Sequence, residues 1–140
     1  MNEPQSITVS LEWAKKLKEA GWPQVTPQNP ASLFYWAHFI GLEEPALVYA
    51  SKVEMIRFDE FEILLSAPTA DEILRRLPND LTLKNEKEGA KSCPLRIGKF
   101  EKRWDVRYFL RGTNFLFLDD SLADACAEMW CYLSANKLLP

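Results

Sequence analysis

Apolar residues recur at helical spacing in residues 9–20. They are three or four positions apart and therefore share one face of a predicted helix: Val9, Trp13, Leu17 and Ala20. Gly21 follows, and it tolerates the left-handed conformation that often ends a helix. Pro23 blocks any continuation, so we expect this helix to end near Ala20.

Two further helices are predicted from their start signals. Thr69 and Glu72 have the spacing of a capping box, which predicts a helix that ends before Pro78. Ser121, followed by Asp124, predicts the start of a third helix that runs to about Ala135. Asn136 is expected to stop it in the left-handed conformation.

Between the helices, short apolar or alternating segments predict strands. Residues 84–91 are polar and are expected to form a mobile loop, whereas Glu101 and Lys102 are expected to form the turn of a hairpin. The predicted strands are residues 33–40, 46–51, 53–58, 61–65, 81–83, 95–100, 103–111 and 115–118, and residues 46–58 could instead form one irregular strand.

The order of these elements predicts an α+β fold with a mainly antiparallel sheet. About three amphipathic helices would pack on one face of that sheet in a two-layer sandwich, leaving the other face partly exposed to water. Residues 1–140 have no linker long enough to separate two domains, so we expect a single domain with residues 1–8 as a flexible lead-in.

Composition restricts the compartment and the class of protein. Hydrophobic residues make up 47% of the 140 residues, enough for a substantial core. No apolar run approaches the ~20 residues that span a membrane, and the N-terminus lacks the pattern of a secretion signal. We therefore expect a soluble, cytoplasmic protein that does not bind membranes.

The three cysteines are expected to be reduced thiols, because they cannot all pair and no Cys-x-x-Cys spacing occurs. Cys126 lies in the apolar stripe of the third helix and is predicted to be a small buried hydrophobe. Cys131 projects to the opposite side near Asp124 and Glu128, whose charges disfavour a thiolate; no cation is expected nearby. Cys93 is expected at a strand edge.

Catalytic patterns are missing from the sequence. His38 is the only histidine, and we expect it to be packed or hydrogen-bonded in its strand rather than to act as a base. The acidic pairs at 43–44, 59–60 and 119–120 fit solvated turns or a helix start. Neither a zinc spacing nor a phosphate-binding glycine loop occurs, so we predict no metal, no cofactor and no catalytic residue.

The most informative segment is the basic hairpin at residues 91–111. It holds seven basic residues against two acidic ones, a net charge of +5, within a chain of net charge −3. Strand alternation from residue 104 predicts one core-facing set and one exposed set. The exposed set contains Arg107, Phe109 and Arg111, and Arg103 lies beside it. These four residues are the predicted binding site.

Three explanations of this arginine-rich face remain open. Arg107 and Arg111 could pair with acidic residues such as Glu60 or Glu62 on neighbouring strands. Arginine and aromatic side chains are also typical of protein interfaces, including contacts between copies of one chain. The same residues could hold phosphates and stack on bases, although the acidic body of the protein would repel nucleic acid.

Several sequence blocks, taken together, resemble a known group of proteins. They occur in the order Leu11–Gly21, Leu33–Trp36, Ser66–Pro78, Trp104–Tyr108 and Ser121–Leu133. This order is similar to that in small bacterial and prophage-type proteins of unknown function. The resemblance covers most of residues 10–139 and implies a phage-derived or mobile-element accessory protein, with no catalytic residues to carry over.

From these observations the predicted function is that of a non-enzymatic interaction protein. It would bind a protein partner, or a second copy of itself, through the exposed sheet face and the basic hairpin. A nucleic-acid-binding module that uses residues 95–111 is the alternative, and a small enzyme with an unrecognised site is a second one.

Overall fold

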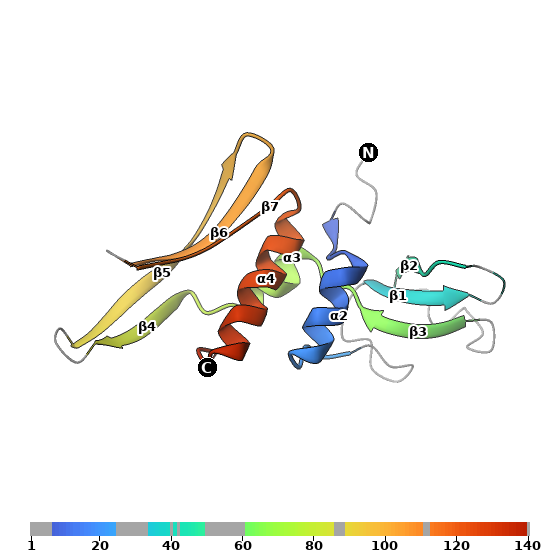
Figure 1. Ribbon diagram of the computed structural model, residues 1–140, viewed down its shortest axis with the longest axis horizontal. Coiled ribbons are helices and arrows are strands. Elements are labelled where there is room, and N and C mark those ends of the chain that lie inside the picture. The colour runs from blue at the N-terminus through green and yellow to red at the C-terminus, as the bar shows by residue number, and fades with distance from the viewer. Residues whose placement is uncertain are drawn as a thin grey trace.

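The computed structural model describes residues 7–24, 34–39, 41, 43–49, 61–85, 89–110 and 113–139. These residues form three helices and two antiparallel sheets. The sheets lie towards opposite ends of the molecule and the helices lie between them (Figure 1). The α+β class, the antiparallel pairing and the packing of helices against a sheet are therefore confirmed, with the strands divided between two sheets.

The larger sheet has the order β4–β5–β6–β7, and every neighbouring pair is antiparallel. Its strands are β4 (Asp80–Asn85), β5 (Gly89–Phe100), β6 (Arg103–Leu110) and β7 (Thr113–Asp119). The first half of β5 pairs with β4 and the second half pairs with β6. The predicted hairpin turn at Glu101–Lys102 is confirmed.

The mobile loop predicted at residues 84–91 is wrong for most of its length. Lys84 and Asn85 belong to β4, and β5 already begins at Gly89. Lys84 pairs with Ala90, and Asn85 pairs with Gly89. Pairing between the two strands supplies the backbone hydrogen bonds that the polar local sequence does not predict.

The smaller sheet has the order β2–β1–β3. Its strands are β1 (Phe34–Phe39), β2 (Ala46–Tyr49) and β3 (Phe61–Ser66), close to three of the predicted segments. The predicted strand at 53–58 lies outside the described residues. Thr8, placed by the sequence in a flexible lead-in, is instead buried and forms an isolated bridge with Thr69.

Two helices begin where their capping residues predict, because α3 (Ala70–Arg76) follows Thr69 and α4 (Leu122–Ala135) follows Ser121. Helix α2 (Leu11–Glu19) begins two residues later than the predicted start at Val9, and Ser10 caps it. In the capping box of α3 the amide of Glu72 donates to Thr69 Oγ1 at 3.2 Å, and the amide of Thr69 donates to a carboxylate oxygen of Glu72 at 3.3 Å.

The end of α4 differs from the prediction. Asn136 has a φ of −97°, whereas the next residue, Lys137, adopts a left-handed φ of 56°. The reversal therefore comes one residue later than predicted, and Asn136 instead donates from its side chain to the carbonyl of Tyr132 at 2.8 Å.

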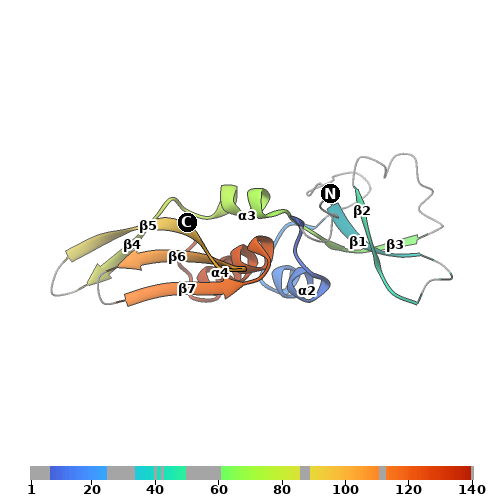
Figure 2. The same cartoon turned by 90° about the horizontal axis from the view of Figure 1, so that it is seen from above.

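Helix α4 joins the two halves of the molecule, because it packs on β6 and β7 and also against α2 and α3 (Figures 1 and 2). Both ends of α2 are bonded to it. The Ser10 amide donates to Asp124 Oδ1 at 2.8 Å, and Ser134 Oγ donates to the Ala20 carbonyl at 3.1 Å. The first bond joins the starts of the two helices and the second joins their ends, so α2 and α4 run parallel.

A continuous buried cluster lies around α4. Trp22 and Trp130 meet edge to face with their ring centroids 5.1 Å apart. Tyr108 of β6 is fully buried and donates its hydroxyl to the carbonyl of Pro78, which ties β6 to the segment after α3. The largest fully buried side chains include Leu17, Ile73, Val106, Tyr108, Cys126, Met129 and Leu133.

Candidate functional site

Strand β6 has one buried face and one exposed face, as its alternation predicts. Val106 and Tyr108 are fully buried, whereas Arg107 between them is exposed. Helix α4 covers the buried side, where Tyr132 packs against Phe117 of β7 with ring centroids 5.5 Å apart. The opposite side of β5, β6 and β7 is called the outer face below.

The register of the three strands defines the outer face, because directly opposed residues of an antiparallel sheet point to the same side. One row contains Arg96, Arg107 and Leu116, and the next contains Gly98, Asp105 and Leu118. Phe100 and Arg103 form the last row beside the turn. The outer face therefore consists of Arg96, Gly98, Phe100, Arg103, Asp105, Arg107, Leu116 and Leu118.

Two arginines lie directly opposite each other in the first row. Arg96 of β5 and Arg107 of β6 are register partners, so their Cβ atoms are about 5 Å apart. Arg107 Nε lies 3.6 Å from Asp105 Oδ2 on its own strand. Among the described residues Arg96 has no acidic partner. One of the two positive charges in this row is therefore not neutralised.

Asp105 occupies the space that a glycine leaves open. Its side chain is 15% exposed, and a Cβ atom added at Gly98 would collide with Asp105 Oδ1. The carboxylate therefore lies across β5 at the one position of this row that has no side chain. From there it stays within reach of Arg107.

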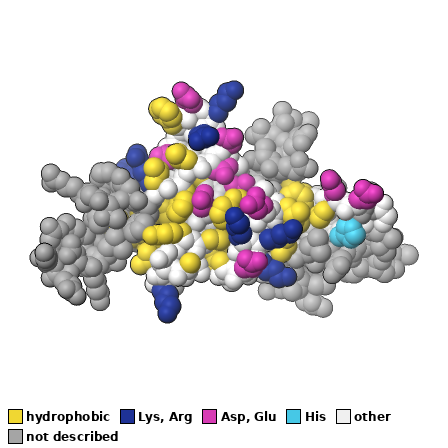
Figure 3. Space-filling view, in the orientation of Figure 1, with side chains coloured by type: hydrophobic (Ala, Val, Ile, Leu, Met, Phe, Trp, Pro, Cys, Tyr) yellow, Lys and Arg dark blue, Asp and Glu magenta, His cyan; other side chains and the backbone are white. Residues whose placement is uncertain are grey.

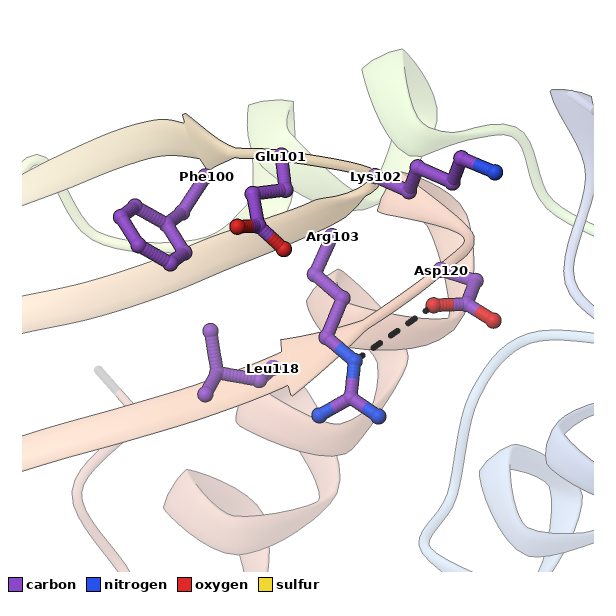
Figure 4. A pocket seen from close by; sticks show the side chains of 6 residues that line it. All are labelled: Phe100, Glu101, Lys102, Arg103, Leu118 and Asp120. Atoms are coloured by element: carbon purple, nitrogen blue, oxygen red, sulfur yellow. Dashed lines mark ion pairs between the residues drawn. The ribbon is translucent and has the colours of Figure 1, made fainter.

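The turn end of the outer face forms an open hollow (Figure 4). It is lined by Phe100, Glu101, Lys102, Arg103, Leu118 and Asp120. Arg103 Nε lies 3.7 Å from Asp120 Oδ1, and both side chains are mostly exposed, so this ion pair adds little stability. Apolar, basic and acidic side chains thus lie side by side near the hairpin tip (Figure 3).

Exposed apolar side chains accompany the arginines. Phe100 is 74% exposed, Leu118 47% and Leu116 43%. These three residues, together with Arg96, were missed by the site prediction. Alternation within residues 95–100 places Arg96 and Phe100 on one side of their strand, and alternation within 115–118 does the same for Leu116 and Leu118. Only the register between the strands shows that these four side chains share a face with Arg107.

Of the four predicted site residues, Arg103 and Arg107 lie on the outer face and are exposed. Phe109 lies in β6 opposite Asn114, but its side chain is outside the described part of the structure. Arg111 lies outside the described residues altogether. Among the described residues, the acidic partner of Arg107 is Asp105 on its own strand rather than a residue of a neighbouring strand.

None of the three cysteines forms a disulfide. Cys126 is fully buried as predicted, and burial raises its pKa to about 12. Cys93 is also fully buried, and it lies opposite Leu81 in the half of β5 that pairs with β4. Burial raises the pKa of Cys131 to about 11, and Lys16 opposes this shift, so the prediction of no cation nearby is wrong as well. The protonated form of both thiols is favoured, which makes them poor nucleophiles.

A second charged region lies between α2 and α4. Burial raises the pKa of Asp124 against the hydrogen bonds from Ser10, and Asp119 and Glu12 raise it further. Burial also raises the pKa of Glu128. Because Asp124 accepts a hydrogen bond from the Ser10 amide at the start of α2, it has a structural role. His38 lies exposed in β1, away from the buried cysteines.

Within the described part of the chain, no group of three or more His, Cys, Asp or Glu side chains is arranged to hold a metal ion. The described helices include none that is long and apolar enough to cross a lipid bilayer. Comparison of the chain with known protein families, with curated proteins and with solved structures gave no match. The function therefore has to be inferred from the geometry of the outer face.

Proposed function

We propose that the protein is a non-enzymatic binding protein, and that its outer face docks a protein partner that carries carboxylates and apolar side chains. The observation that carries this proposal is the row formed by Arg96, Arg107 and Leu116. Two like charges and an exposed leucine lie there as direct neighbours on a sheet face that no described helix covers.

Opposed like charges on a sheet are unfavourable, so an acidic group bound between them would relieve the repulsion. Asp105 pairs with Arg107 and not with Arg96, because its Oδ2 lies 3.6 Å from Arg107 Nε. A partner carboxylate at Arg96 would form a charge-assisted hydrogen bond, which contributes about 1.5–3 kcal/mol. The outer face therefore has one cationic side chain, Arg96, that has no acidic partner among the described residues and lies beside Arg107.

The exposed apolar residues fit the same kind of partner. Phe100 lies at the turn end, and Leu116 and Leu118 lie on β7, so the apolar positions flank the charged ones. Interfaces between proteins combine such apolar anchors with arginine. An extended segment with acidic and apolar residues in alternation would match this arrangement.

Nucleic acid is the less favoured partner. Three acidic residues, Glu101, Asp105 and Asp120, lie on or beside the outer face and would repel phosphates. Residues outside 91–111 add a net charge of −8. Phe100 is the single described aromatic side chain on this face, which gives successive bases little to stack on.

The test uses an array of synthetic extended peptides in which Glu and Leu alternate, followed by fluorescence anisotropy on the best binder. Replacing Arg96→Gln and Arg107→Gln together should weaken binding by about tenfold or more, the equivalent of about 1.4 kcal/mol. The matched control is the double variant Lys15→Gln and Lys18→Gln, which changes the net charge equally at exposed positions of α2. This control should bind as the wild type does.

Three results would contradict the proposal. The first is equal binding by the arginine variant and the wild type. The second is equal loss in the arginine and lysine variants, which would indicate a general charge effect. The third is tighter binding of a single- or double-stranded oligonucleotide than of any peptide, with a steep loss of affinity as salt rises. A phage or mobile-element origin stays a prediction of the sequence.

A further inference from the structure

Strand β7 is an edge strand without the usual protection. It pairs with β6 on one side, and no other described strand pairs with it on the other (Figure 2). Its sequence, Thr-Asn-Phe-Leu-Phe-Leu-Asp, has no charged residue before Asp119 and no proline. Such an edge offers a row of backbone donors and acceptors to another strand.

Two other edges of this sheet contain charged residues. Strand β4 carries Asp80 and Lys84. The second half of β5, which pairs only with β6, carries Arg96 and Lys99. Charged side chains, lysine above all, are a common means of preventing edge-to-edge pairing. Among these edges, β7 differs by its lack of charge over six consecutive residues.

We propose that β7 pairs antiparallel with β7 of a second copy of this chain, and that the two-fold axis passes beside Leu116. This pairing would join the two sheets into one continuous sheet with isologous symmetry. All seven residues of β7 would be paired. The strands would form about six to eight backbone hydrogen bonds, because opposed residues in an antiparallel pair exchange two bonds at every second position.

The distribution of charge supports this register. With Leu116 opposite the partner's Leu116, Asp119 lies opposite the partner's Thr113 at the far end of the strand. The carboxylates of the two copies are thus as far apart as the strand allows. A parallel pair would place the two Asp119 residues side by side, which is unfavourable. The strand is therefore complementary to itself only in the antiparallel sense.

The exposed leucines support the same occupant. Leu116 and Leu118 are 43% and 47% exposed on the outer face of an edge strand. At the two-fold axis the two Leu116 side chains would cover each other, with the partner's Leu118 one position further on each side. The outer faces of the two copies would then form one surface, with an Arg96–Arg107 pair on each side of the leucines.

The self-opposition of Leu116 allows a sharp test by light scattering and sedimentation velocity over a wide range of protein concentration. The wild type should reach twice the monomer mass, and both Leu116→Lys and Leu116→Glu should remain monomeric because each places like charges at the axis. An equimolar mixture of the two variants should recover the dimer. The matched control is Ile97→Lys on β5, since Ile97 is also 43% exposed, and this variant should dimerise.

Far-UV circular dichroism confirms that each variant is folded, and Asn114→Lys provides a second charge on the same edge if either Leu116 variant is not. A wild type that stays monomeric at every concentration would overturn the proposal. So would a Leu116→Lys variant that dimerises as Ile97→Lys does, or a mixture that stays monomeric. Growth beyond a dimer would also overturn it, because two-fold pairing is closed. Loss of peptide binding by the arginine variant alone would leave this test unaffected.

Discussion

The stability of the fold should fall at alkaline pH because Cys126 is buried beneath the sheet that carries the outer face. An exposed thiol has a pKa near 9.0, and burial raises the pKa of Cys126 to about 12. Between these values the unfolded chain loses the thiol proton and the folded protein keeps it. The free energy of unfolding therefore decreases as pH rises above 9, by up to ~1.4 kcal/mol per pH unit.

The variant Cys126→Ala removes this dependence. At pH 8 it should be about 1 kcal/mol less stable than the wild type, because one buried heavy atom is lost from the core. At pH 10 ionisation of this thiol in the unfolded chain has lowered the free energy of unfolding of the wild type by about 1.4 kcal/mol, whereas the variant has no thiol at this position and loses nothing from it. The difference in stability between the two proteins should therefore close by pH 10.

Urea denaturation followed by far-UV circular dichroism, under reducing conditions at several pH values, measures this difference. Cys131 and Tyr108 also resist ionisation, and both are present in the two proteins. Since Cys126 is one of the groups that raise the pKa of Tyr108, the comparison stops at pH 10, where both groups keep their protons in the folded protein. Ile73→Val is the control, since Ile73 is fully buried and does not titrate, and its deficit should stay constant. Parallel pH profiles for Cys126→Ala and the wild type would show that the thiol is not buried on the inner face of α4.

Three further predictions concern the elements that hold β6 and its neighbours. Tyr108→Phe removes the hydroxyl bonded to the Pro78 carbonyl and should lower the free energy of unfolding by about 1 kcal/mol in urea; no change would mean that this bond is not formed. Glu101→Gly removes the backbone strain of a non-glycine residue at a φ of 55° and should increase the free energy of unfolding by about 1 kcal/mol, which is measured as a higher thermal midpoint; a lower midpoint would contradict the turn geometry. Thr69→Ala removes one half of the capping box with Glu72 and should cost about 1 kcal/mol by chemical denaturation, so an unchanged midpoint would count against the cap.

Local signals were sufficient to predict the ends of most helices and the hairpin turn. The Thr69 and Ser121 caps act over three residues, and both form in the structure as the sequence indicates. The same holds for the turn at Glu101. In each case the stabilising partner is a near neighbour in the chain, so a short stretch of sequence contains the whole interaction.

Pairing between distant residues could not be predicted in this way. Residues 84–91 are polar enough to be read as a loop, yet Lys84 and Ala90 are register partners in the β4–β5 hairpin. The division of the strands into two sheets has the same origin, because the choice of neighbour depends on tertiary packing rather than on strand propensity. The reversal at Lys137 instead of Asn136 shows that helix ends are uncertain by a residue.

The candidate site could be predicted within one strand but not across strands, because pairing between distant residues decides which side chains become neighbours. Period-two alternation correctly places Arg107 outward and Tyr108 inward on one strand. It does not reveal that Arg96 lies opposite Arg107, or that Leu116 completes their row. Those neighbours follow only from the register, which depends on the turn and on the packing of α4 across the sheet.

The two hydrogen bonds from α4 to the ends of α2 have a consequence for synthesis of the chain. Ser10 is translated 114 residues before Asp124, an interval of roughly 6–23 seconds at 5–20 residues per second. During this interval the start of α2 lacks its acceptor, and its last carbonyl lacks the hydroxyl of Ser134. Helix α2, the first of the described helices to be translated, thus gains these two hydrogen bonds only after α4 has been made, and until then the apolar face around Leu17 lacks the packing that α4 supplies.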